Sequence, residues 1–401
     1  MSVLFGHPTG SPFSHNAALA HLEAGHLEGI CVPWMPSITT LRVLDQIKPL
    51  RFMTQRLSRR HFPPLAKAPK VQGRPGELRR LLTRASGWGG DRLSNEANDW
   101  LMRTMTRECR RPGVTAVHAY EDCSLWQFAE AKRLGKACIY DMPIGYYPAW
   151  ERMEAELAKK YPDWLPAGRQ SQEVRREQKC KEMELADLSL APSSFVADTI
   201  RDFYPNKPVA IAPYGVDLIG WSPDTARAPR DVITFLFAGH CSLRKGTPLL
   251  LAAWRAAGLK GARLQLVGHW RLAETKKREL PPGCCWTGPV SSHQLRSFYH
   301  GADIFVFPTN FEGRALVVGE ALASGLPVLT TQASGTQDMI DESCGRIVPL
   351  DDLEALVESL RWFANNRERL PGLSRAARSN VKRCTWEQYR GRVAESVGPY
   401  I

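Results

Sequence analysis

The stretch from residue 303 to residue 331 most constrains what this chain can fold into. Its two ends, 303–308 and 328–331, are short runs of β-branched, aliphatic and aromatic residues, which predict buried strands. Between them, apolar residues over 316–322 recur with helical spacing, and the Gly-Leu-Pro run at 325–327 ends that helix. A strand, a loop, a short helix and a second strand in this order predict one βαβ unit.

The loop and helix start of this unit, residues 312–315, predict a phosphate site, because free backbone N–H groups and the positive end of the helix dipole point outward there. Two carboxylates flank the helix start: Glu312 lies in the loop and Glu320 follows eight residues later. Carboxylates repel phosphate, so we expect them to bind hydroxyl groups, as acidic residues bind ribose in dinucleotide sites. A sugar nucleotide offers both kinds of group.

These residues resemble a known signature. Glu312 and Glu320, with the flanking strands and the Gly-Leu-Pro stop, are similar to the E-x7-E motif of retaining glycosyltransferases with the GT-B fold, in particular glycosyltransferase family 4. The resemblance implies an α/β protein with two Rossmann-like domains that face each other across a cleft. The sequence departs from the family at Arg314 and Ala315, where an aromatic residue and a glycine are usual. The alternative interpretation is an ordinary helix with one surface glutamate and one capping glutamate.

The resemblance also implies roles for individual residues. Glu320 is expected to bind the ribose of the donor and Glu312 to act in catalysis. Backbone at the helix start is expected to contact the donor at Arg314, Ala315, Leu316 and Val317.

A second basic turn precedes this unit. Residues 239–246 form a glycine-flanked strand-to-helix turn that contains Arg244 and Lys245, and charge-assisted hydrogen bonds from such residues suit a diphosphate. A surface charge pair is the alternative. The family has a similar sequence in this turn, so the resemblance implies that Arg244 and Lys245 act in catalysis. His240 stands where the family usually has an arginine. Three further donor contacts are implied by resemblance at Gly268, Pro289 and Val290.

The N-terminal residues predict another glycine turn. An apolar strand over 1–5 runs into a loop that contains Gly10, and 16–23 predict a helix. The glycine spacing is not G-x-G-x-x-G, so a plain tight turn is the alternative. By resemblance this loop faces the donor across the cleft, and Gly10 allows close backbone approach.

Residues 51–92 are the compositional outlier. They contain eleven Lys and Arg residues against Glu77 and Asp91, a local excess of nine positive charges in a chain of net charge +12. Apolar residues such as Phe52, Leu57 and Phe62 are interleaved, and prolines and a glycine predict a loop-rich segment. The pattern fits an anionic membrane surface or a phosphate-bearing acceptor, and a solvated basic face is the alternative. No nucleic-acid-binding module is recognised, so no specific nucleic acid is expected.

Strand ends in the first half supply acceptor-side candidates. The strand predicted from Val114 ends at His118, and the strand from Ala137 ends at Asp141, with Tyr146 a few residues on. Functional side chains of parallel sheets gather at the carboxyl ends of strands. His118 is the catalytic candidate, although a structural hydrogen-bonding histidine is the alternative.

The chain as a whole is long enough for two or three domains at 401 residues. We predict an acceptor-side Rossmann-like domain over 1–217, a nucleotide-sugar donor domain over 218–384, and a C-terminal helix over 385–401 that by resemblance crosses back to the first domain. Residues 222–229 are polar and rich in proline, as expected of a linker.

No apolar run reaches the roughly 18 to 20 residues that a membrane-spanning helix needs, and no signal-peptide pattern begins the chain, so a cytoplasmic protein, peripheral at the membrane, is expected. The ten cysteines include no C-x-x-C pair, which predicts reduced, mostly buried residues and not a zinc site or a disulfide framework.

Together these features predict a retaining glycosyltransferase that uses a nucleotide-diphosphate sugar and a glycan or lipid-linked acceptor. No D-x-D motif or metal-ligand cluster occurs, so neither a metal nor a cofactor is expected. No carboxylate nucleophile can be named. The alternatives are a sugar-nucleotide epimerase or phosphorylase on the same fold, and a non-catalytic binding protein that uses the basic segment.

Overall fold

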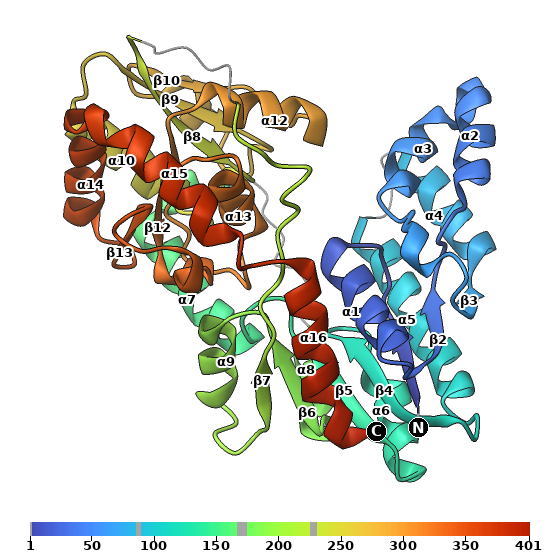
Figure 1. Ribbon diagram of the computed structural model, residues 1–401. Coiled ribbons are helices and arrows are strands. Elements are labelled where there is room, and N and C mark those ends of the chain that lie inside the picture. Colours follow the sequence, from blue (N-terminus) through green and yellow to red (C-terminus); the bar gives the residue numbers. More distant parts are fainter. Residues whose placement is uncertain (1, 86–89, 167–174, 225–230) are drawn as a thin grey trace.

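The computed structural model describes residues 2–85, 90–166, 175–224 and 231–401. Two α/β domains lie side by side, and each is built on one parallel sheet covered by helices (Figure 1). The expected α/β class with two Rossmann-like domains is confirmed.

The first domain contains a seven-stranded sheet in the order β3-β2-β1-β4-β5-β6-β7, and all its pairs are parallel. The order reverses direction between β1 and β4, so the loops that follow these two strands diverge at a topological switch point. The strands are β1 (Ser2–Gly6), β2 (Leu27–Val32), β3 (Lys70–Gln72), β4 (Val114–Tyr120), β5 (Ala137–Asp141), β6 (Leu188–Ala191) and β7 (Val209–Ile211).

The helices of this domain begin at residues that can cap them. Ser11 accepts a hydrogen bond from the backbone of Ser14, which returns one, so the first helix begins at Pro12, four residues before its predicted start. The Ser193 hydroxyl accepts a hydrogen bond from the Val196 amide and so caps the ninth helix. The helices packed on the sheet are α1 (Pro12–Glu23), α5 (Gly90–Glu108), α6 (Leu125–Arg133), α7 (Tyr147–Lys160), α8 (Arg176–Leu185) and α9 (Ser194–Arg201).

A helical extension, defined here as residues 37–85, lies at the far edge of the first domain and also contributes the outermost strand of the sheet, β3 (Figure 1). The prediction of a loop-rich segment is wrong, because its apolar residues fall at helical spacing and share a small core of their own. This core contains Leu41, Met53, Leu57 and Leu81. The helices are α2 (Ile38–Gln46), α3 (Arg51–Ser58) and α4 (Arg74–Ala85), with two short 3-10 turns at Lys48–Leu50 and Pro63–Leu65.

The second domain contains a six-stranded parallel sheet in the order β10-β9-β8-β11-β12-β13, with its switch point between β8 and β11. The strands are β8 (Ile233–Ala238), β9 (Ala262–Val267), β10 (Cys284–Trp286), β11 (Ile304–Phe307), β12 (Val328–Thr331) and β13 (Gly345–Val348). The helices are α10 (Thr247–Ala257), α11 (Thr275–Arg278), α12 (Ser292–Gly301), α13 (Leu316–Ala323), α14 (Leu353–Asn365) and α15 (Leu370–Val381).

The chain passes between the domains twice, and the two connecting segments lie side by side. Val216, on the way out of the first domain, pairs with Thr385, on the way back. The last helix, α16 (Trp386–Val397), then packs on α1 of the first domain, where Arg390 forms an ion pair with Glu23 at 2.6 Å. Most of the predicted linker 222–229 lies outside the described residues, and the exact domain boundaries stay a prediction.

Two further expectations can be placed on the structure. All ten cysteines are unpaired, and six of them are buried. Within the described ranges, every helix is too short or too polar to cross a bilayer.

Candidate functional site

The candidate site is built by the two loops at the switch point of the second sheet. One loop, 239–246, follows β8 and leads into α10, and the other, 308–315, follows β11 and leads into α13. Ligands of doubly wound sheets bind outside the carboxyl ends of the strands at this point. The glycine turn and the E-x7-E stretch, predicted separately, therefore meet in space.

Backbone contacts hold the two loops together. Gly246 has a left-handed φ of 69°, and a Cβ atom there would stand 1.8 Å from the Pro308 carbonyl oxygen, so only glycine fits. Asn310 donates from its backbone to the Arg244 carbonyl oxygen at 2.8 Å and from its side chain to the Leu243 carbonyl oxygen at 2.9 Å. These bonds fix the basic residues of one loop beside the carboxylate of the other.

Arg244 and Lys245 both contact the carboxylate of Glu312. Arg244 Nη1 lies 3.1 Å from Glu312 Oε1 and donates to the Phe311 carbonyl oxygen over the same distance, while Lys245 Nζ donates to the same Oε1. Burial lowers the pKa of Lys245, and the charge of Glu312 opposes this shift. Two cations against one carboxylate leave a net positive charge, which suits a diphosphate.

Glu320 lies on α13 and faces a cleft between the domains. The Tyr299 hydroxyl donates to Glu320 Oε2 at 3.2 Å. Burial raises the pKa of Glu320 to about 7, with the charge of Asp217 adding to the shift and the hydrogen bond from Tyr299 opposing it. Near neutral pH this side chain therefore exists in both protonation states.

The cleft that contains Glu320, called here the main cleft, has a volume of about 810 Å³. Its second-domain wall includes Glu320, Leu316 and Arg296, and its first-domain wall is formed by α1 and by the segment that follows α3 in the helical extension. The first-domain side contributes Pro12, His15, Asn16, Leu19, Glu23, Arg59, His61, Phe62 and Pro64.

A smaller cleft of about 270 Å³, called here the second cleft, contains Arg244. His240 and Arg271 line the same wall, and Trp150 and Glu154 of α7 lie on the first-domain side. The two sides come from different domains, so the second cleft, like the main one, changes whenever the domains move relative to each other.

A direct contact between the domains involves the loop that carries Glu312. Phe311 is buried, with its ring centre 5.4 Å from the rings of both Trp150 and Phe195. Gly145 lies so close that a Cβ atom there would stand 2.5 Å from the Phe311 ring. The loop after β5 therefore packs directly on the loop after β11.

The residues at the start of α13 differ in what they can offer a ligand. The Arg314 side chain is buried, and its guanidinium pairs with Asp338 at 2.7 and 2.9 Å, so this side chain is part of the scaffold. The Ala315 amide donates to the Ser334 carbonyl oxygen at 2.9 Å and is therefore not free for phosphate, contrary to expectation. Leu316 and Val317 form the first turn of α13, whose amides lack helical partners, and Leu316 lines the main cleft.

The acceptor-side candidates lie in the core of the first domain. His118 is fully buried, with Nδ1 2.8 Å from His21 Nε2 and Nε2 3.4 Å from Asp141 Oδ2. Burial lowers the pKa of His118 to about 3 and raises that of Asp141 to about 7. Tyr146 is buried as well. In this structure none of the three lines the main cleft or the second cleft, and β4 continues past His118 to Tyr120.

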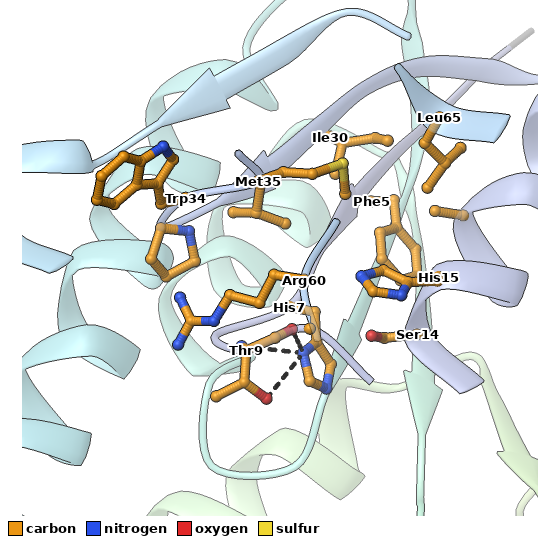
Figure 2. Close-up of a pocket in the computed structure, with 14 residues that line it drawn as sticks. Phe5, His7, Thr9, Ser14, His15, Ile30, Trp34, Met35, Arg60 and Leu65 are labelled. Carbon is orange, nitrogen blue, oxygen red and sulfur yellow. Dashed lines mark hydrogen bonds between the residues drawn. The ribbon is translucent and has the colours of Figure 1, made fainter. Parts of the chain in front are cut away.

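The first glycine loop lies under the helical extension. A Cβ atom at Gly10 would stand 2.9 Å from Arg60 Cα, so the close approach that this glycine permits is to Arg60 and not to open cleft. Figure 2 shows the small cavity around this contact, with His7 held against Thr9 and His15 nearby.

Of the remaining donor-side candidates, one lines a cleft and three do not. A Cβ atom at Gly268 would stand 1.9 Å from the Gly239 carbonyl oxygen, so Gly268 lets the loops after β8 and β9 run in contact. Pro289 is exposed, Val290 packs on the second-domain core, and neither lines the two clefts. His240 lines the second cleft.

Sequence reasoning missed the residues that join the domains. Phe311 and Gly145 carry no motif, and only their contact shows their importance. Arg271 follows a predicted strand end in an otherwise unremarkable loop. The one signal in the sequence for Arg271 was its place shortly after the strand predicted over 264–267.

Residues 232–366 match the family model described as Glycosyl transferases group 1. The putative colanic acid biosynthesis glycosyltransferase WcaL of Escherichia coli K12 is 26% identical over 49% of this chain and 52% of its own length. A GDP-mannose-dependent alpha-mannosyltransferase of Corynebacterium glutamicum is 29% identical over 51% of this chain and 50% of its own. The chain thus spans about half the length of these curated relatives.

Solved structures match over the whole chain. A sucrose-phosphate synthase from Thermosynechococcus elongatus superimposes with a TM-score of 0.64 at 17% identity, covering 100% of this chain and 98% of that one. Anabaena HepE in complex with UDP gives a TM-score of 0.62 at 11% identity, with 100% of both chains covered. At identities this low, the structural likeness establishes the fold alone. Residues 232–366 of this chain thus match the family model of the glycosyl transferases group 1, and the chain as a whole has the two-domain GT-B fold of these solved structures.

Proposed function

We propose that this chain is a retaining glycosyltransferase that transfers a sugar from a nucleotide-diphosphate sugar to an acceptor. One observation carries the proposal. Arg244 and Lys245 meet Glu312 at the switch point of the second sheet, and Glu320 on the following helix faces the main cleft. This places cations for a diphosphate and carboxylates for hydroxyl groups on the two loops and the helix of one switch point.

In this proposal Arg244, Lys245 and the first turn of α13 bind the diphosphate, and Glu320 binds the ribose. The cations neutralise the leaving phosphate as its charge develops, which is the main electrostatic demand of the reaction. Glu312 orients the two cations and the transferred sugar. These residues bear the charge by themselves, so we propose activity without a metal ion or cofactor.

Related proteins support a nucleotide-sugar donor. Structures of HepE hold UDP, UDP with glucose, and UDP-glucose, and one curated relative is named for its dependence on GDP-mannose. Uracil and guanine nucleotides are therefore the first donors to test.

The main cleft supports an anionic acceptor. The wall of the main cleft opposite Glu320 is lined by Arg59, His61 and Phe62, which follow α3 in the helical extension. A negatively charged or lipid-linked acceptor glycan that enters along this wall meets a cation and an aromatic ring before it reaches the donor.

The helical extension also supports docking on an anionic membrane. It exposes Ile38, Val43, Ile47, Phe52, Leu78 and Leu82 among exposed basic residues such as Arg56, Arg59 and Lys67. Exposed apolar and basic side chains together suit an anionic leaflet.

Part of the predicted basic segment serves the fold instead. Arg60 and Arg80 are buried and both pair with Glu77 at 2.9 Å, so these two arginines are not surface charges. Leu57 is buried in the core of the extension, so the prediction that it contacts lipid is wrong. The side chains of Arg84 and Arg92 lie outside the described part of the chain.

A panel of nucleotide diphosphates and nucleotide-diphosphate sugars tests the proposal, with the thermal shift of the protein as the measurement. A ligand at 100 times its dissociation constant stabilises the folded state by about 2.7 kcal/mol, which is readily measured.

Glu320→Ala should weaken donor binding. Glu312→Ala should lower kcat more than it changes KM, by about 100-fold, since it removes a positioning group. Unchanged kinetics in both variants would contradict the assignment.

Product analysis separates the alternatives. An epimerase converts the nucleotide sugar without a glycan acceptor. A phosphorylase instead transfers a sugar from a glycan to inorganic phosphate and forms a sugar 1-phosphate. A non-catalytic binding protein releases no nucleotide diphosphate under any condition. The proposed transferase releases it only when both donor and acceptor are present.

A further inference from the structure

The second cleft contains a basic residue outside both donor motifs, Arg271, beside the donor-side candidate His240. Arg271 lies on the loop after β9, and His240 lies on the loop after β8. Among the residues that the structure describes, neither side chain has an ion-pair or hydrogen-bond partner, and both are exposed to the cleft. Arg244, by contrast, is already engaged by Glu312 at 3.1 Å.

Backbone pairing fixes Arg271 beside the glycine turn. The Cys241 amide donates to the His269 carbonyl oxygen at 2.8 Å, and the Arg271 amide donates to the Cys241 carbonyl oxygen at 2.9 Å. Gly268 and Gly239 permit this approach because neither carries a side chain. Arg271 is therefore anchored by its backbone while its side chain extends into the second cleft.

The charges in the second cleft favour an anion. Arg244 and Arg271 line one wall with neutral His240, whose pKa is lowered by burial and then by the charge of Arg271. Glu154 lies on the opposite wall and already interacts with another residue. Two guanidinium groups, each with several N–H donors in a fixed plane, match the geometry of an oxyanion such as a phosphate.

We propose that the second cleft is a phosphate subsite, in which Arg271 and His240 join Arg244 in binding one phosphate group. The source we assign is the phosphate next to the sugar in a nucleotide-diphosphate sugar, and this assignment alone rests on the proposed function. Arg271 would then be a donor-binding residue that lies outside both motifs.

Isothermal titration with paired nucleotides tests the assignment. The probes are UDP with UMP, GDP with GMP, and ADP with AMP. For the pair that binds, Arg271→Gln should weaken the diphosphate about tenfold or more, the usual cost of one charge-assisted hydrogen bond, and leave the monophosphate unchanged. Arg278→Gln, an exposed arginine in the same domain, is the matched control and should change neither. Arg271 is exposed, so we expect an unchanged melting temperature.

Inorganic phosphate distinguishes the two sources of the group. If Arg271→Gln weakens inorganic phosphate binding but changes the diphosphate less than twofold, the phosphate belongs to another substrate and the donor assignment is wrong. If it changes neither probe, the subsite itself is refuted while the proposed function stands. If the wild-type protein binds no nucleotide diphosphate, the proposed function fails, and the phosphate titration still decides whether the subsite exists.

Discussion

Gly313 of the second domain lies directly against Pro143 of the first, so closely that a Cβ atom at position 313 would stand 1.8 Å from the Pro143 carbonyl oxygen. The Ser193 hydroxyl donates to the Gly313 carbonyl oxygen at 2.6 Å and fixes the same contact. Gly313 follows Glu312 in the sequence. The position of the candidate site is therefore coupled to the distance between the domains.

A methyl group at position 145 should disturb this coupling. In Gly145→Ala the new Cβ atom would stand 2.5 Å from the Phe311 ring, so the domains must separate or Phe311 must leave its position. We expect a lower kcat by about tenfold or more, since small displacements of positioned groups are costly, and a larger radius of gyration in small-angle scattering. Gly372→Ala, where the added atom meets open space, is the control. Equal activity and size in both variants would contradict the coupling.

Donor affinity should depend on pH through Glu320. The pKa of Glu320 is raised from 4.5 to about 7, so the carboxylate is protonated as the pH falls through 7. A protonated carboxyl accepts hydroxyl hydrogens less well, and donor affinity measured by titration calorimetry should fall about tenfold from pH 8 to pH 6. Glu320→Gln should bind weakly at both pH values.

The same shift predicts a change in stability that does not depend on a ligand. A carboxyl whose folded pKa is raised favours folding below its unfolded pKa, and this contribution is lost as the pH rises through the folded value. Relative to wild type, Glu320→Gln should therefore unfold at a higher urea concentration at pH 8 and at an equal one at pH 4.5. A constant difference at both pH values would show that the pKa of Glu320 is not raised.

His118 should prove structural. His118 is fully buried and neutral, and His21 Nε2 contacts it at 2.8 Å. We expect His118→Ala to lower the free energy of unfolding by about 1–3 kcal/mol, because it leaves a buried polar group without its partner. The kcat of the folded variant should stay close to that of wild type. A 100-fold loss of kcat with unchanged stability would instead place His118 in the reaction.

Activity should survive chelation, and the product should keep the anomeric configuration of the donor. Arg244 and Lys245 supply the positive charge that a divalent ion would otherwise bring to the diphosphate. Turnover in EDTA, compared with turnover in manganese, measures the first property, and proton NMR of the fresh product measures the second. Strict dependence on manganese, or an inverted product, would refute the corresponding part of the proposal.

Membrane docking should depend on the exposed part of the helical extension. Each basic residue near an anionic leaflet contributes about 1 kcal/mol, so Arg56→Glu with Arg59→Glu should reduce binding to anionic liposomes by more than tenfold at low salt. Lys260→Glu with Arg278→Glu, exposed residues of the second domain, is the matched control. Sedimentation with liposomes measures both. Equal binding to neutral liposomes, or none to either kind, would leave the extension a solvated basic face.

Local pattern in the sequence was sufficient for the elements and for the spacing of the donor motif. Strands 303–308 and 328–331, the helix between them and the capping of α16 by Thr385 follow from short-range periodicity and side-chain hydrogen bonds. Glu312 and Glu320 lie on one short segment, so their separation is set by the helix itself. The helices of the extension were missed because prolines and charges obscured a short apolar period.

Tertiary structure alone decided which of these side chains a ligand can reach. His118 and Asp141 stand at predicted strand ends in the sequence, yet both are buried in the folded domain. Arg314 lies in the motif, yet it is held by Asp338. The contact of Gly145 with Phe311 and the approach of Arg271 to the glycine turn join segments far apart in the chain. Periodicity reports only neighbours along the chain, whereas exposure and pairing depend on which distant segments the two sheets bring together.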